Sequence, residues 1–232
     1  MSHPVAPQPG IVTPQPPRHE LPRFARGVNL PAPSFNSPDF VPGVYGTNYT
    51  YPTGDDLDYF KSKGLTLFRL PFSWERMQRT QFGPLDAEQV GYMDTFLAAA
   101  HARNVQVILD VHAFDRYYNV LIGTATVPNS AFADFWGKLA ARYATETTIT
   151  GYDLSNEPHD TGGLWPATAQ AATNAIRLVD HMHTIVVEGD NYAAGSTWTT
   201  YNETLSINDP DNNLKYSAHV YFDADASGQY VQ

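Results

Sequence analysis

The chain has 232 residues, of which 42% are hydrophobic and 13% aromatic, so it can bury one sizeable core and is too short for two comfortable domains. Its 24 acidic residues outnumber 14 basic ones scattered along the chain, and the net charge of −10 excludes nucleic acid as an expected partner. No cysteine is present, which excludes disulfides, zinc–thiolate sites and a cysteine nucleophile.

The first 22 residues differ in character from the rest of the chain. They hold seven prolines and few large apolar side chains, which predicts a Pro-rich linker or disordered terminus outside the core. They show no charged region followed by an apolar stretch, so no signal peptide is visible. No run approaches about 18 apolar residues, so we expect no membrane span. The predicted organisation is a linker over 1–22 and one folded domain over 23–232.

From Phe24 onward, short apolar strands alternate with helical segments, which predicts an α/β protein with a parallel sheet. Asp86 followed by Gln89 resembles a capping box, and Gly64 stands where a helix C-cap glycine belongs. Helices are predicted at about 54–63, 86–103, 130–143 and 166–182, with a short one near 199–205. The six predicted strands are Ala25–Leu30, Leu65–Pro71, Val105–Val111, Ile149–Leu154, Thr184–Glu188 and Leu214–Phe222.

Two architectures fit this alternation, an open doubly wound sheet and a closed eight-stranded barrel. The first strand is followed by RGVNLPAP rather than by a Gly-rich phosphate loop, which weakens the case for a nucleotide-binding sheet. Polar residues follow nearly every strand, as in a barrel whose site is assembled from the carboxyl ends of its strands. We therefore predict a barrel.

The polar residues near the strand ends form one set. His219 and Tyr221 are two apart in a strand and so share a face, and each member of the set would be costly to bury unpaired. Taken singly, each has a structural interpretation, such as an ion pair or a satisfied buried histidine. The order of the set along successive strands favours a functional rim made of Arg69, His112, Asn156, Glu157, His219 and Tyr221.

The segments RGVNL, FRLPFSWERM, LDVHAF, LSNEPH, VVEGDNY and HVYFDADASG together resemble glycoside hydrolase family 5, on its bacterial and fungal endoglucanase side. The resemblance runs from about residue 24 to the last residue. It implies a (β/α)8 TIM barrel of which this chain holds strands one to six, which makes 23–232 a catalytic domain. It also implies a secreted retaining endo-β-1,4-glucanase, extracellular or periplasmic, that cleaves internal bonds of cellulose-like polysaccharide.

The resemblance assigns the chemistry to the NEP triplet. Glu157 is the implied general acid/base, and Asn156 is implied to hydrogen-bond the sugar 2-hydroxyl. A retaining hydrolase uses two carboxyl groups about 5–5.5 Å apart, one as acid/base and one as nucleophile. We expect burial and the neighbouring carboxylate to raise the pKa of the acid.

The other four rim residues receive supporting roles from the same resemblance. Arg69 and Tyr221 are implied to position the nucleophile. His112 and His219 are implied to line the cleft beside the scissile bond. Ala113 departs from the family pattern, because many members carry Asn after the strand-three His.

The nucleophilic Glu of the family follows strand seven, in a Gly-Glu-Phe/Tyr-Gly type of motif, and this chain ends after strand six. We therefore expect the chain by itself to be inactive. Glu188, at the end of strand five, is the one Glu at the same level of the barrel as the family's nucleophile, and it is the alternative nucleophile. Asp110 and Asp153 precede strand ends and are expected to face the helices or to support the rim.

Two further features of the sequence carry predictions. Aromatic rings suit the C–H faces of sugars, and we predict Trp198 and Tyr117 as sugar platforms. His181 and His183 form an H-x-H pair, but they precede strand five, at the opposite end of the barrel, which indicates a surface helix terminus rather than a metal site.

The expected partner is a β-1,4-glucan polysaccharide or oligosaccharide, and we expect no metal, no cofactor and a monomer. Two alternatives stay open at this point. The chain could be an inactive fragment that only binds β-glucan. It could also act on a related β-linked glycan such as mannan or xyloglucan, since the rim residues address the bond rather than the sugar.

Overall fold

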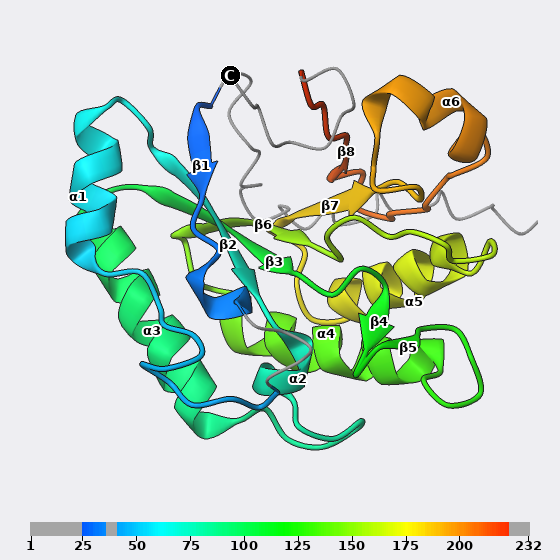
Figure 1. Cartoon of the computed structure of the whole chain (residues 1–232), viewed down its shortest axis with the longest axis horizontal. Coiled ribbons are helices and arrows are strands. Elements are labelled where there is room, and N and C mark those ends of the chain that lie inside the picture. The colour runs from blue at the N-terminus through cyan, green and yellow to red at the C-terminus, as the bar shows by residue number, and fades with distance from the viewer. Residues whose placement is uncertain (1–24, 36–40, 223–232) are drawn as a thin grey trace, which may run out of the picture.

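The computed structural model describes residues 25–35 and 41–222. Six parallel strands form one sheet whose spatial order follows the chain, β1-β2-β3-β6-β7-β8 (Figure 1). The strands are β1 (Gly27–Asn29), β2 (Leu67–Phe72), β3 (Gln106–Val111), β6 (Ile149–Asp153), β7 (Thr184–Glu188) and β8 (Leu214–Ser217). This is an incomplete (β/α)8 barrel with six strands, which confirms the predicted fold. The linker predicted over 1–22 lies outside the described residues.

Helices cover the outer face of this sheet (Figure 1). The long ones are α1 (Gly54–Ser62), α3 (Ala87–Ala102), α4 (Asn129–Tyr143) and α5 (Trp165–Arg177). Two short helices, α2 (Trp74–Met77) and α6 (Trp198–Tyr201), follow β2 and β7, with single 3-10 turns at Ala32–Ser34 and Gly195–Thr197. A small hairpin of β4 (Arg116–Tyr117) and β5 (Val120–Leu121) follows β3 and was not predicted.

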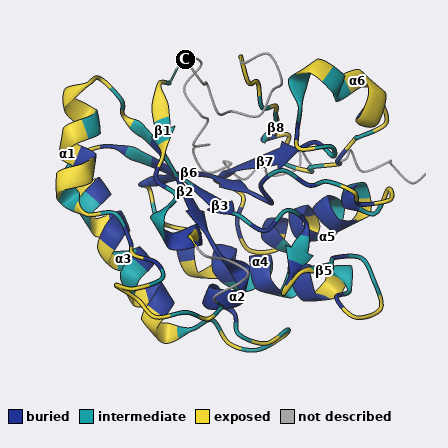
Figure 2. Cartoon of the chain, in the orientation of Figure 1, coloured by how far each residue is buried: buried dark blue, intermediate teal, exposed yellow. Residues whose placement is uncertain are grey.

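The core lies between the sheet and the helices, and the buried sides of the helices face the strands (Figure 2). All five residues of β6 and all five of β7 are buried, as expected for central parallel strands covered by helices. Helix α4 buries Phe132, Phe135 and Trp136 completely. Burial of each such side chain contributes about 1.5–3 kcal/mol, so the fold depends strongly on this aromatic layer.

Local hydrogen bonds and backbone conformation determine where the helices begin and end. Asp86 accepts from the backbone N–H of Gln89 at 3.1 Å and so caps α3, but the Gln89 side chain bonds the Tyr49 hydroxyl instead of closing the predicted capping box. Gly64 has φ of +81°, which confirms the predicted C-cap glycine of α1. Helix α5 ends at Arg177 rather than near 182, because Asp180 turns the chain by accepting from the His183 N–H at 3.0 Å.

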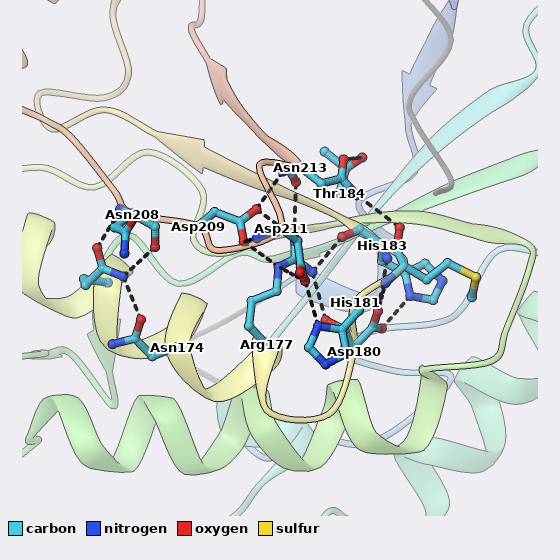
Figure 3. A network of polar contacts seen from close by, with 12 residues as sticks. Asn174, Arg177, Asp180, His181, His183, Thr184, Asn208, Asp209, Asp211 and Asn213 are labelled. Carbon is cyan, nitrogen blue, oxygen red and sulfur yellow. Dashed lines mark hydrogen bonds and ion pairs between the residues drawn. The ribbon is translucent and has the colours of Figure 1, made fainter. Parts of the chain in front are cut away.

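The H-x-H pair lies in a polar network before β7, shown in Figure 3. His181 bonds Asp211 and is exposed, with Nδ1 2.8 Å from the carboxylate. His183 is fully buried and places its Nδ1 2.5 Å from Asp180. The prediction of a surface terminus is therefore wrong for His183, which instead joins a buried cluster around Arg177 that holds the end of α5 against β7.

Within residues 25–35 and 41–222, no three His, Asp or Glu side chains are grouped so as to hold a metal ion. None of the helices in these ranges has the length and apolar character needed to cross a bilayer.

Candidate active site

A cleft of about 340 Å³ opens at the carboxyl ends of the strands. Because parallel strands all end at the same edge of the sheet, residues far apart in sequence meet there. One lining residue, Asn29, was not predicted, although it is the polar residue that ends the first strand. The described residues that line the cleft are Asn29, His112, Asn156, Glu157, His219, Val220 and Tyr221.

Glu157 projects into this cleft from the loop after β6. Its carboxylate Oε1 is 2.6 Å from His219 Nδ1 and accepts from the Tyr221 hydroxyl at 3.0 Å. The residue has φ of +45°, in the left-handed region that non-glycine residues rarely adopt. Such backbone conformations cost about 1–3 kcal/mol and persist where surrounding contacts determine them.

His219 lies between two carboxylates. Its Nδ1 contacts Glu157, and its Nε2 is 3.0 Å from Glu188 Oε1. Burial acts to lower the pKa of His219, but the hydrogen bonds with Glu157 and Glu188 outweigh burial and raise it to about 10. The ring therefore carries a positive charge at neutral pH.

The electrostatics of Glu157 differ from the expectation. Burial acts to raise the pKa of Glu157, but the hydrogen bonds from His219 and then from Tyr221 prevail and lower it. The predicted upward shift is thus wrong for this arrangement, in which no second carboxylate lines the described part of the cleft. Tyr221 donates to Glu157 here, whereas it was expected to position a nucleophile.

Arg69 lies under the cleft, in the middle of β2, and joins three buried carboxylates. Its NH1 is 3.0 Å from Asp110, its Nε 2.9 Å from Asp153 and its NH2 2.8 Å from Glu188. The same NH2 donates to Asn156 Oδ1 at 3.1 Å. Arg69 therefore ties four strands together and fixes the orientation of the Asn156 amide.

The three carboxyl groups share the guanidinium of Arg69, and Glu188 also contacts His219. Burial raises the pKa of Asp153 well above its usual range, against the attraction of Arg69. Asp110 and Asp153 are register partners on β3 and β6, and both side chains turn inward to Arg69. They support the rim from below; the other expectation, that they face the helices, is wrong.

His112 is oriented by Asp110. Its Nδ1 lies 2.8 Å from Asp110 Oδ2, and the ring lines the cleft. A carboxylate at that distance accepts a hydrogen bond from Nδ1–H, which leaves Nε2 as the nitrogen available to the cleft. His112 thus presents one defined nitrogen beside Glu157.

Glu188 is fully buried and is not among the cleft-lining residues. Its Oε1 accepts from Arg69 and His219, and its Oε2 accepts from the Glu157 backbone N–H at 2.6 Å. A nucleophile needs an oxygen that faces the anomeric carbon, and both oxygens of Glu188 face the protein. This geometry argues against Glu188 as the alternative nucleophile.

The two predicted sugar platforms lie elsewhere. Tyr117 is only 4% exposed, packs its ring 4.2 Å from that of Trp74 and donates its hydroxyl to the Gln78 carbonyl. The platform role predicted for Tyr117 is therefore wrong. Trp198 lines a separate groove of about 660 Å³ together with Leu205 and Tyr216, outside the cleft that holds Glu157.

Comparison with known proteins places this geometry in a family. Residues 25–231 match the sequence profile of the cellulases, glycosyl hydrolase family 5. The chain is 33% identical over 193 residues to endo-β-1,4-glucanase B of Emericella nidulans, covering 82% of this chain and 57% of that protein. It is 32% identical over 206 residues to endoglucanase 3 of Humicola insolens, covering 87% of this chain and 52% of that protein.

Solved structures give the same result. An endoglucanase from Pseudomonas stutzeri, also solved with cellobiose, superposes with a TM-score of 0.86 at 42% identity, over 89% of this chain and 63% of that chain in the complex. An endo-β-1,4-glucanase from Xanthomonas axonopodis pv. citri superposes with a TM-score of 0.84 at 35% identity, over 88% and 67%. The chain therefore spans about half to two thirds of the length of these relatives.

Proposed function

The chain belongs to glycosyl hydrolase family 5, the cellulase family, and from this premise we propose that it acts as a retaining endo-β-1,4-glucanase with Glu157 as general acid/base. The observation that carries the proposal is the Glu157 carboxylate, which enters the cleft with Asn156 and His112 beside it. The proposed partner is a β-1,4-glucan, and the proposed setting is a secreted, monomeric enzyme.

The proposed chemistry assigns each group a task. Glu157 protonates the leaving glycosidic oxygen and later removes a proton from the incoming water. Asn156 accepts from Arg69 through Oδ1, which leaves its Nδ2 as the donor to a sugar hydroxyl. His219 and Tyr221 hold the Glu157 carboxylate in place between these steps.

The pKa of Glu157 must rise when the enzyme is poised to react. In this structure His219 and Tyr221 hold it low. A nucleophilic carboxylate about 5–5.5 Å away would oppose that effect, because two neighbouring negative charges disfavour each other. The acid role therefore depends on the second carboxyl group that double displacement requires.

A second candidate function is β-glucan binding without hydrolysis. One observation favours it: among the described residues that line the cleft, Glu157 is the only one with a carboxyl group. In that case His112, Asn156 and Asn29 would still offer hydrogen bonds to a sugar. A related glycan such as mannan or xyloglucan stays a further alternative substrate.

The test compares the wild-type protein with Glu157→Gln. In a form of the protein that carries the second carboxyl group, we expect Glu157→Gln to lower hydrolysis of soluble β-glucan by about 10²–10⁴-fold with binding retained, because the amide keeps the shape of the side chain but cannot transfer a proton. Glu75→Gln is the control, since Glu75 is a glutamate that is 4% exposed and lies outside the cleft. Binding by wild type without turnover would support the second candidate, and unchanged hydrolysis in Glu157→Gln would refute the acid/base assignment.

A further inference from the structure

Glu188 makes more contacts with the acid/base machinery than any role assigned to it so far explains. It is the last residue of β7, and its side chain is fully buried. One oxygen accepts from Arg69 at 2.8 Å and from His219 at 3.0 Å, and the other accepts from the Glu157 backbone at 2.6 Å. The backbone carbonyl of Glu188 accepts from the Trp165 indole at 2.7 Å, so the residue is anchored on both sides.

The contact with the Glu157 backbone bears on the left-handed conformation of that residue. Glu157 has φ of +45° and is followed by Pro158. Its N–H points into the protein, where a negatively charged acceptor makes a short hydrogen bond. The side chain is thereby directed out into the cleft, toward His219 and Tyr221.

The contact with His219 bears on the charge of the ring. A neutral imidazole has one N–H, so it can donate to only one of the two carboxylates that it touches. The ring satisfies both Glu157 and Glu188 only when both nitrogens are protonated. Arg69 contacts Glu188, and Tyr221 and His112 act on Glu157. The remaining charged or titratable groups that the described residues bring to this cluster are Asp110 and Asp153, which contact Arg69.

We infer that Glu188 is a positioning residue for catalysis: it fixes the backbone of Glu157 and keeps His219 doubly protonated between two carboxylates, without touching substrate. Glu188 thus sets the charge that faces Glu157. This inference rests on the proposed function only in its link to catalysis, because the bridged imidazolium can be observed in the protein itself.

The first measurement uses the unmodified protein. Nitrogen-15 chemical shifts of the His219 ring at about pH 8 report whether one or both nitrogens carry a proton. We expect a doubly protonated ring, in keeping with its pKa of about 10. A neutral ring at that pH would overturn the inference with no substitution needed.

The second measurement compares Glu188→Gln with Glu75→Gln. Glu75 is the matched control because it is buried, accepts a backbone N–H, that of Tyr118, at 3.0 Å, and has no contact with His219. We expect Glu188→Gln to lower the pKa of His219 by about 1–3 units, since it removes one of two opposite charges. Glu75→Gln should leave that pKa unchanged.

Binding separates positioning from substrate contact. Glu188 does not line the cleft, so the affinity of Glu188→Gln for cellotetraose should stay within about twofold of wild type, a change below about 0.4 kcal/mol. A His219 pKa that does not move in Glu188→Gln would refute the positioning role. Failure of the proposed function would show instead as unchanged hydrolysis in Glu157→Gln, whatever the His219 titration gives.

Discussion

Replacing Arg69 by Met removes the one cation shared by three buried carboxylates and keeps an unbranched side chain of similar length. Asp110 and Glu188 are fully buried and Asp153 is 2% exposed, so solvent cannot take over the lost contacts. Breaking a buried ion pair by removing one partner costs about 3–5 kcal/mol. Against a total stability of about 5–15 kcal/mol for a domain, this is a large fraction.

The stability that Arg69→Met loses relative to wild type should depend on pH. Burial already raises the pKa of Asp153, and without the guanidinium it rises further because the attraction of Arg69 no longer opposes burial. The folded variant then binds more protons than the unfolded chain, so its stability falls as pH rises above the unfolded pKa of about 4. The deficit relative to wild type should therefore be larger at pH 7 than at pH 5.

Urea unfolding followed by tryptophan fluorescence measures both effects, since Trp74, Trp136 and Trp165 are fully buried. Arg142→Met is the matched control, because the Arg142–Asp94 pair has side chains 43% and 42% exposed and should be worth at most about 1 kcal/mol. If Arg69→Met lost no more stability than Arg142→Met at pH 7, or lost the same amount at both pH values, the reasoning on the buried carboxylates would fail.

Two further predictions concern residues away from the acid/base. Asp115 is fully buried, burial raises its pKa to about 8, and neither carboxylate oxygen has a hydrogen-bond partner among the described residues. The stability of Asp115→Asn relative to wild type should therefore increase by about 1.4 kcal/mol per pH unit between pH 5 and 7. A stability difference independent of pH in urea titrations would contradict this. Gly64→Ala should cost about 1–2 kcal/mol of stability because φ is +81° there. Gly91 lies inside α3 with open space around it, so Gly91→Ala should stabilise the protein by about 0.5–1 kcal/mol in thermal unfolding. Equal effects of the two substitutions would show that backbone conformation is not the cause.

The sheet could be predicted from sequence because its strands are apolar runs of the right length between helical patterns. The boundaries of β7 agree with the predicted Thr184–Glu188, and β6 differs by one residue. The hairpin of β4 and β5 could not be predicted, since each strand has two residues and no period of alternation. Helix α5 was predicted too long, because the turn that ends it depends on a side chain three residues beyond Arg177.

The cleft residues could be predicted from their places after the strands, but not their partners. The roles drawn from the family resemblance for Arg69, His112, Asn156, Glu157, His219 and Tyr221 stay predictions. Sequence position shows that Glu188 ends a strand, yet whether its side chain faces the cleft or the interior depends on the twist of the sheet. Tyr117 illustrates the same limit: its place in a rim loop indicated exposure, and packing against Trp74 buries it.

The cleft draws its lining from both edges of the sheet, with Asn29 from β1 and Tyr221 from the segment after β8. These edge strands are partly exposed along their length, whereas β6 and β7 are buried throughout. Edge elements open locally at lower free energy than the centre of a sheet. Mild heating or low denaturant should therefore disperse Asn29 and Tyr221 while Arg69 keeps its contacts with the buried carboxylates, so that affinity for the proposed glucan ligand is lost before the sheet melts.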